Sequence, residues 1–158
     1  MNEGAGFVQF TPNGPGAATL QNLTLSIIAC GVSAESLRRY HTGYTSYRYQ
    51  YAGNFSNVSP VWWFGAYHSS ELPLLFGTHD EYRARSTPEE WATSYAMQAF
   101  WLSFASDPSA GPRWLAPNGS YVAWPKFQPG NASMALFAEG ETLVRWVAPE
   151  RIDNECPR

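Results

Sequence analysis

The sequence predicts a single globular domain that contains both helices and strands. The chain has 158 residues, of which 44% are hydrophobic and 16% aromatic, so it is long and apolar enough to bury a core. One segment alternates aromatic and polar residues at the spacing of a strand, and a later one has the start signal and the apolar content of a buried helix. A third segment, near the end of the chain, has the pattern of a β-hairpin.

A helix and a strand are predicted in the first half of the chain. The helix begins near Ser33 and stops at Gly43, because acidic residues favour the first turn of a helix, basic residues its last turn and glycine its end. The strand is the segment SYRYQY, residues 46–51, in which tyrosines alternate with polar residues and form an aromatic face. It ends at Gly53, and a loop then leads to the segment around His68.

The second half is predicted to contain a long buried helix and a hairpin. Thr87 is a suitable N-cap, Pro88 fits the first helical position, and Glu90 completes a capping box. Apolar side chains surround much of the axis of this helix, near 88–105, so most of it is expected to be buried. After a segment rich in proline and glycine, residues 132–148 (ASMALFAEGETLVRWVA) predict a hairpin with a glycine turn.

Charge and hydropathy exclude several classes of function. The net charge is −3 and the ten Lys and Arg residues form no block, so the sequence has no electrostatic footprint for nucleic acid. Its apolar runs are far too short to span a bilayer. The first residues, MNEGAGFVQF, have neither the basic n-region nor the apolar h-region of a signal peptide.

The sequons nevertheless favour a secreted protein, whereas the cysteines leave two possibilities open. The sequence contains five N-x-S/T sequons, which are candidate glycosylation sites: Asn22, Asn54, Asn57, Asn118 and Asn131. Its two cysteines, Cys30 and Cys156, fit no metal-binding spacing and form either one long-range disulfide or two free thiols. Sequons without a signal peptide predict that the natural N-terminus lies upstream of this chain.

His68 is the main candidate for chemistry among three histidines. His41 follows a predicted helix end, and His79 lies in a polar turn and is expected to be solvated. The H-x-x-E spacing of His68 and Glu71 would need further ligands to bind zinc, and no His or Cys cluster supplies them, so we expect neither a metal nor a cofactor. The sequence has many serines but neither a G-x-S-x-G turn nor an HGGG-type run for an oxyanion hole.

Several segments match one pattern in their order along the chain. NEGAGF, at residues 2–7, comes first, and SYRYQYAGNFSNVSP and GAYHSSELPLLFG follow. The helix from STPEEW to WLSFASDPSAGP comes next, and WPKF and DNEC lie near the end. Together these segments resemble the type B carboxylesterases and lipases, the cholinesterase-like α/β-hydrolases, and most closely their fungal branch of secreted esterases.

The resemblance implies that residues 1–158 are the C-terminal part of a single α/β-hydrolase domain, with its last core strands, a buried helix and a terminal hairpin. It implies that His68 is the catalytic base and that Glu3 is the acid that orients it. Glu71 is too close to His68 in the sequence to be that acid, and we expect it to support the site or to lie at the start of a helix.

The order Ser, acid, His in α/β-hydrolases places the nucleophile upstream of Met1. The chain would then carry the base and the acid of a serine esterase or lipase without its nucleophile, and we expect it to be inactive alone. The resemblance also implies that Cys30 and Cys156 form the family's long-range disulfide. Two features depart from the family pattern: Gly31 stands where proline is usual, and the stretch between Glu3 and Cys30 is short.

The implied substrate of the full-length protein is a small-molecule or lipid ester, hydrolysed outside the cell without a cofactor. Two alternatives belong to other classes: a non-catalytic cholinesterase-like adhesion or binding module, and an unrelated secreted aromatic-rich binding domain. An upstream G-x-S-x-G turn would favour the enzyme, and a replaced serine would favour the module. The sequence specifies neither the particular ester nor the oligomeric state.

Overall fold

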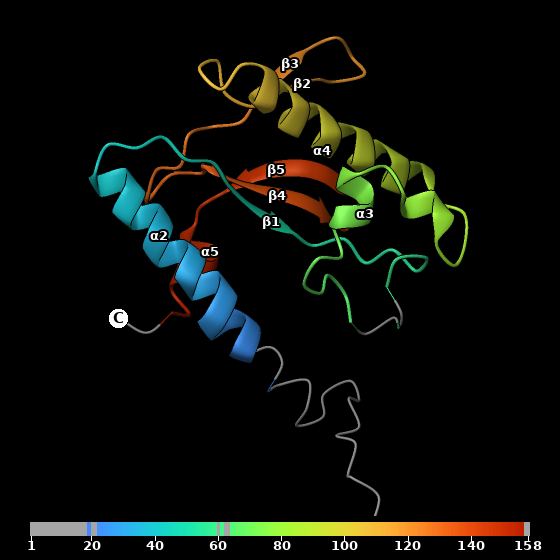
Figure 1. The fold of residues 1–158 in the computed structure, drawn as a ribbon, viewed down its shortest axis with the longest axis horizontal. Coiled ribbons are helices and arrows are strands. Elements are labelled where there is room, and N and C mark those ends of the chain that lie inside the picture. Colours follow the sequence, from blue (N-terminus) through green and yellow to red (C-terminus); the bar gives the residue numbers. More distant parts are fainter. Residues whose placement is uncertain (1–18, 20–21, 60, 62–63, 157–158) are drawn as a thin grey trace, which may run out of the picture.

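A three-stranded sheet lies at the centre of the fold, in the order β1-β4-β5 (Figure 1). The structure is a computed structural model, and it describes residues 19, 22–59, 61 and 64–156. Strand β1 (Arg48–Tyr51) runs parallel to β4 (Met134–Glu139), and β4 runs antiparallel to β5 (Thr142–Val147). The parallel pairing requires a crossover between β1 and β4, and this connection contains most of the other elements.

Helices cover both faces of this sheet. Helix α4 (Pro88–Ser106) lies on one face, and α2 (Cys30–His41) and α5 (Glu150–Asp153) lie on the other (Figure 1). Because both faces are covered, β4 is buried along most of its length. The smaller elements are the π-helical segment η1 (Thr24–Ala29), helix α3 (Leu72–Leu75), the 3-10 helix η2 (His79–Glu81) and the hairpin of β2 (Arg113–Leu115) and β3 (Tyr121–Ala123).

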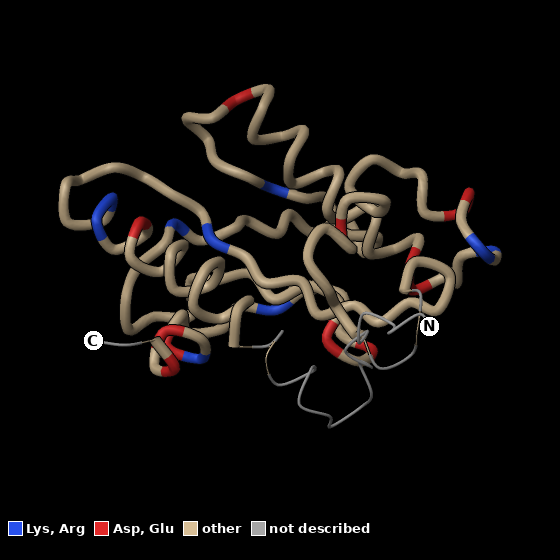
Figure 2. Tube along the Cα trace, turned by 60° about the horizontal axis from the view of Figure 1, so that its bottom comes forward, with Lys and Arg blue, Asp and Glu red and all other residues tan. Residues whose placement is uncertain are grey.

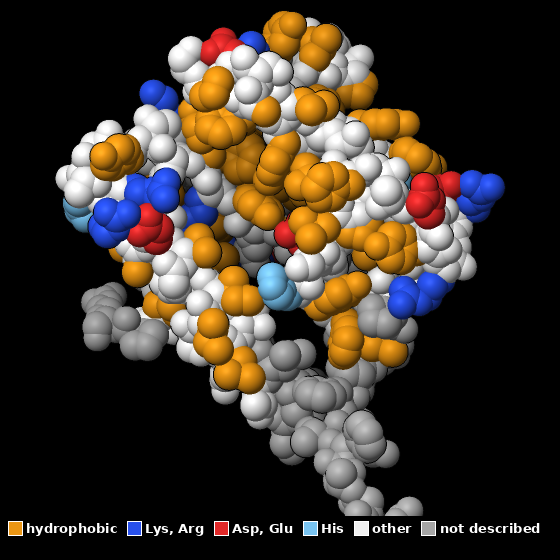
Figure 3. Space-filling view, viewed as in Figure 1, with side chains coloured by type: hydrophobic (Ala, Val, Ile, Leu, Met, Phe, Trp, Pro, Cys, Tyr) orange, Lys and Arg blue, Asp and Glu red, His pale blue; other side chains and the backbone are white. Residues whose placement is uncertain are grey.

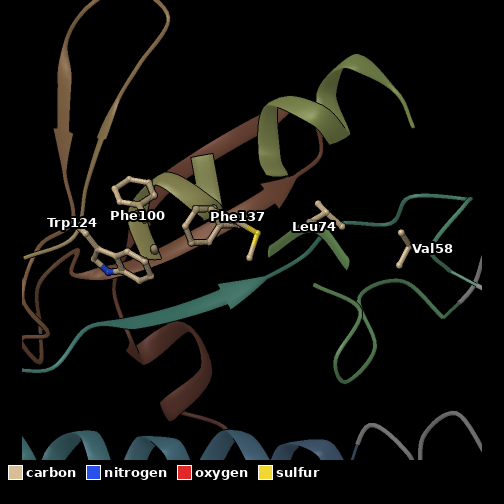
Figure 4. Packing of buried hydrophobic residues seen from close by; sticks show 7 residues of the cluster. Val58, Leu74, Phe100, Trp124 and Phe137 are labelled. Atoms are coloured by element: carbon tan, nitrogen blue, oxygen red, sulfur yellow. The ribbon is translucent and has the colours of Figure 1, made fainter. Parts of the chain in front are cut away.

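Aromatic side chains form the core between α4 and the sheet. Phe100 of α4, Phe137 of β4 and Trp124 are buried, and Figure 4 shows their rings close together between the helix and the strands. The centroid of the Phe100 ring lies 5.9 Å from that of Phe137 and 5.4 Å from that of Trp124. Such edge-on pairs contribute about 0.5–1.5 kcal/mol each beyond the burial of their area. Leu74 and Val58 extend this core toward the loops that follow β1 (Figure 4).

The opposite face of the sheet buries a charge. The sequence predicts Arg48 on the polar side of an aromatic strand, but only 4% of this residue is exposed. Its guanidinium group donates two hydrogen bonds to the carboxylate of Asp153 in α5, at 2.8 and 2.6 Å. Strand β1 is therefore buried on this face as well, because α5 covers it and supplies the compensating charge.

Helix α4 confirms the predicted helix and its N-cap. The Thr87 hydroxyl accepts a hydrogen bond from the backbone N–H of Glu90 at 3.2 Å. In a capping box the Glu90 side chain would reach back to Thr87. Here it is buried beside His79 instead. The burial is also less complete than predicted, because Tyr95 and Leu102 are 60% and 64% exposed on the outer side of the helix.

The other predicted elements form with small changes in their bounds. The helix expected near Ser33 begins earlier, at Cys30, where it continues directly from η1. The predicted strand forms over Arg48–Tyr51, and the predicted terminal hairpin is β4 and β5. The segment after α4 that is rich in proline and glycine contains a further hairpin, β2 and β3, which the sequence did not predict.

A disulfide joins the start of α2 to the chain that follows α5. Cys30 and Cys156 are bonded, with 5.5 Å between their Cα atoms and a sequence separation of 126 residues. The structure thus confirms the pairing that the family resemblance implies. Composition left open either a disulfide or two free thiols, and the structure contains the disulfide.

Charged side chains are scattered over the part of the chain that the structure describes (Figure 2). Several of them pair locally, as Glu35 does with Arg38 and Arg39 on α2, at 2.7 and 2.6 Å. None of the helices in this part of the chain is long and apolar enough to cross a membrane.

Candidate active site

His68 lies on an exposed turn between β1 and α3. A hydrogen bond from the backbone N–H of Ser70 to the carbonyl of Tyr67, at 3.0 Å, closes the turn. Ser69 has a φ of 70°, a left-handed conformation that is uncommon for a residue other than glycine. Because such strained residues cluster at functional sites, the local backbone favours a functional role for this turn.

Contacts on both sides hold the His68 turn in place. Before it, the Tyr67 hydroxyl donates a hydrogen bond to the carbonyl of Val58 at 3.2 Å. After it, Leu74 of α3 is fully buried, and the Ser94 hydroxyl of α4 donates to the Leu74 carbonyl at 2.6 Å. The histidine is therefore exposed on a turn whose two ends are fixed to the core, as the support of a catalytic side chain requires.

Glu71, which precedes α3 directly, is linked to β1. Its side chain makes no capping hydrogen bond to α3, but its Oε1 accepts a hydrogen bond from the hydroxyl of Tyr49 at 3.2 Å. Burial, and then the charge and the hydrogen bond of Glu71, raise the pKa of the Tyr49 hydroxyl to about 12. The hydroxyl therefore stays protonated at physiological pH and continues to donate to Glu71.

Glu3, the predicted partner of His68, lies outside the described residues, so its pairing with His68 stays a prediction. Within the described part of the chain, Nδ1 of His68 lies 3.4 Å from the hydroxyl oxygen of Ser69. This distance is longer than the roughly 2.6–3.2 Å that usually separates a histidine base from the serine that it activates. The described side chains also include no group of three or more His, Cys, Asp and Glu residues that could hold a metal ion.

A second histidine, His79, lies in a buried polar cluster that the sequence did not indicate. The sequence predicts a solvated His79, but none of its surface is exposed. Its Nδ1 lies 2.6 Å from the Ser86 hydroxyl and 3.5 Å from a carboxylate oxygen of Glu90. The amide nitrogen of Asn57 donates to the His79 carbonyl at 2.9 Å and to the Ser86 hydroxyl at 3.0 Å. The cluster thereby joins the loop before α4 to the loop after β1.

This buried cluster has the residue types of a Ser-His-acid triad but not its geometry. In a triad, the serine and the acid contact opposite nitrogens of the imidazole ring, whereas Ser86 and Glu90 both approach Nδ1 of His79. His79 and Glu90 are fully buried, and the Trp91 ring packs on the imidazole at a centroid distance of 4.4 Å. A substrate has no access to this histidine, so we assign the cluster a structural role.

An aromatic pocket of about 350 Å³ lies between β1 and α4. In Figure 3, hydrophobic side chains surround a hollow on the face of the molecule that is turned toward the viewer. The pocket is lined by Arg39, Thr45, Ser46, Tyr47, Tyr49, Phe100, Trp101, Phe104, Pro112 and Trp124. Tyr49 connects it to the candidate site, because its ring lines the pocket while its hydroxyl donates to Glu71.

Burial separates the five candidate glycosylation sites. Asn57 is only 3% exposed, and its amide nitrogen is engaged in two hydrogen bonds, so this fold cannot accommodate a glycan there. Asn57 is therefore the buried one among the five candidates. The other four asparagines are exposed: Asn22, Asn54, Asn118 and Asn131.

Residues 16–151 match the carboxylesterase family, and the chain belongs to this family. Carboxylesterases have the α/β-hydrolase fold, with which a sheet covered by helices on both faces is consistent. No solved structure matches the chain significantly.

Two curated relatives are similar to most of this chain. A chlorogenic acid esterase of Aspergillus niger is 55% identical to it over 142 residues, which cover 85% of this chain and 28% of that protein. Secreted lipase 5 of Gibberella zeae is 39% identical over 131 residues, which cover 82% of this chain and 23% of that protein. The chain therefore spans about a quarter of the length of the curated relatives it matches.

Proposed function

We propose that this chain is the C-terminal part of a secreted serine carboxylesterase or lipase, and that His68 is its general base. The observation that carries the proposal is the position of His68. It is exposed on a strained turn that is fixed to the core at both ends, within the region that matches the carboxylesterase family. The second histidine, His79, is buried, so a substrate has no access to it and it is not a competing base.

In the proposed reaction, His68 accepts the proton of a serine hydroxyl as the serine attacks the carbonyl carbon of an ester. The imidazolium then gives this proton to the leaving alcohol, and the acyl-enzyme is hydrolysed by water with the same histidine as base. Glu3 holds the imidazole in the required tautomer and stabilises the imidazolium. Glu71, bound by the Tyr49 hydroxyl, keeps the start of α3 and thus the His68 turn in position.

The nucleophilic serine and the donors of the oxyanion hole come from a part of the protein outside this sequence. The sequence contains no G-x-S-x-G turn, and in this fold the oxyanion donors lie beside that turn and on an earlier loop. This chain alone is therefore expected to be inactive. The names of the two relatives, an esterase of chlorogenic acid and a lipase, favour a small-molecule or lipid ester as the substrate class.

The test is a pair of histidine variants in a longer protein that includes the upstream coding sequence with its G-x-S-x-G turn. His68→Ala should lower the hydrolysis of a short-chain nitrophenyl ester by roughly 10⁴–10⁶-fold, as removal of a triad base does. His41→Ala is the matched control, because His41 is also exposed but lies at the end of α2, and it should keep full activity. Equal activity of both variants, with folding verified by circular dichroism, would remove His68 from the mechanism.

A further inference from the structure

The hairpin of β2 and β3 presents two large apolar side chains to solvent near its turn. Leu115 is 52% exposed and Tyr121 is 72% exposed. The two residues are direct partners in the hairpin register, so they form one apolar surface rather than two isolated exposures. The turn that joins their strands contains Asn118, the asparagine of the sequon Asn118-Gly-Ser.

Asn118 has the geometry of an accessible acceptor. Its side-chain oxygen accepts hydrogen bonds from the backbone N–H of Ser120 at 3.0 Å and from the Ser120 hydroxyl at 2.7 Å. Its amide nitrogen makes no hydrogen bond within the part of the chain that the structure describes, and the residue is exposed. Gly119, with a φ of 82°, allows the tight turn that brings the sequon hydroxyl back to the Asn118 amide.

Two other sequons lack this geometry. Asn57 is buried and its amide nitrogen is already bonded. Asn131 is exposed, but the serine of its sequon, Ser133, is 2% exposed and exchanges hydrogen bonds with the backbone of Gln128, both at 2.9 Å. The hydroxyl that a sequon requires is therefore not available beside Asn131.

We propose that Asn118 carries an N-linked glycan and that its first sugar covers the apolar pair of Leu115 and Tyr121. The donor is an oligosaccharide linked to a lipid diphosphate. The amide nitrogen forms a bond to the anomeric carbon, and the bond from that carbon to the diphosphate oxygen breaks, so that the lipid diphosphate leaves with the electron pair. The proton that the nitrogen loses passes to solvent. The C–H face of a sugar ring packs on an aromatic ring, and a glycan is a bulky, solubilising group. The proposal rests on the secretory route in the proposed function and is independent of ester hydrolysis.

Occupancy can be measured site by site, because trypsin separates Asn118 from the other sequons. Cleavage after Arg113 and Lys126 yields a peptide, residues 114–126, in which Asn118 is the only sequon asparagine. The longer protein is expressed in yeast behind a heterologous secretion leader, and the glycans are trimmed to one N-acetylglucosamine. Mass spectrometry should find most of this peptide carrying the sugar, and the peptide from 127 to 145 with Asn131 largely free of it. Asn118→Gln and Ser120→Ala should each abolish the modification.

A heterologous leader keeps this test separate from natural secretion and from catalysis. An unmodified 114–126 peptide in a secreted protein that is glycosylated at another sequon would overturn the assignment. The covering role has its own readout, the binding of a hydrophobic fluorescent dye. Asn118→Gln should raise dye binding at least twofold and Asn131→Gln should not, and adding Leu115→Ser and Tyr121→Ser should reverse the rise. An Asn118→Gln protein with unchanged dye binding would refute the covering role.

Discussion

Arg48 shows how a single long-range partner decides where a charged side chain lies. Its guanidinium group makes two nearly parallel hydrogen bonds to Asp153, and it also lies over the ring of Phe127, 5.8 Å from the centroid. Only 3% of the Arg48 side chain and 16% of the Asp153 side chain are exposed, so water does little to screen the pair. The pair fixes β1 to α5, on the face of the sheet that α4 does not cover.

Arg48→Ala is expected to lower the free energy of unfolding by about 3–5 kcal/mol, because it leaves the carboxylate of Asp153 buried without its partner. Chemical denaturation of the longer protein measures this loss. Arg38→Ala is the control, since Arg38 pairs with Glu35 on the exposed side of α2 and should leave the midpoint nearly unchanged. A loss of under 1 kcal/mol for Arg48→Ala would show that this ion pair is dispensable.

Residues whose role depends on near neighbours were predictable, and residues with distant partners were not. Thr87 and Pro88 mark the start of α4 in the sequence because a helix start is built from adjacent positions. The burial of Arg48 and of His79 depends on Asp153, Ser86 and other residues that only the folded chain brings near. In the candidate site, the sequence indicated His68 and Glu71, and the family resemblance gave His68 the role of base. The hydrogen bond from Tyr49 to Glu71 required the structure.

Among the elements, the connection between α3 and α4 depends on the buried cluster around His79. Asp80 also stabilises this connection. The backbone N–H of Ser86, and then Arg85, hold the pKa of the Asp80 carboxyl below the ordinary value. Asp80 therefore supports the loop at pH above that ordinary value, and this support is lost as the pH falls toward the lowered pKa. Two exposed arginines, Arg83 and Arg85, lie in the same loop and offer sites for trypsin.

His79→Ala is expected to loosen this connection, because each buried polar group that loses its partner costs about 1–3 kcal/mol. Limited trypsin digestion of the longer protein should then cut faster after Arg83 and Arg85 than in the unchanged protein. His41→Ala, at an exposed position, should leave the rate unchanged. This prediction replaces the sequence-based expectation of a solvated His79, and an unaltered cleavage rate for His79→Ala would contradict it.

The short elements β2, β3 and α3 were not predicted from the sequence, and the reason is physical. Strands β2 and β3 have three residues each, too few for a period of two to stand out. Helix α3 has four residues, and its place depends on the hydrogen bond between Ser94 and Leu74 rather than on helix propensity. The apolar content of α4 did not reveal which side is covered, so the exposed Tyr95 and Leu102 were not foreseen.

At the scale of the whole molecule, the disulfide is the strongest constraint outside the core. Reduction, or replacement of Cys30 and Cys156 by alanine, should lower the stability by up to about 4–5 kcal/mol, because the bond closes a long loop in the unfolded chain. Denaturation of protein made in an oxidising compartment, with and without reductant, measures this loss, and peptide mapping without reduction identifies the bond. Two thiols that react with an alkylating reagent in secreted material would contradict the prediction.

The same bond sets an order of events during synthesis. Cys156 is added 126 residues after Cys30, and a ribosome that adds about 5–20 residues per second needs on the order of ten seconds for this stretch. Throughout that time the thiol of Cys30 lacks its native partner, and β1 lacks β4, the strand with which it pairs. The sheet and the covalent bond are therefore completed together and late in the synthesis of the chain.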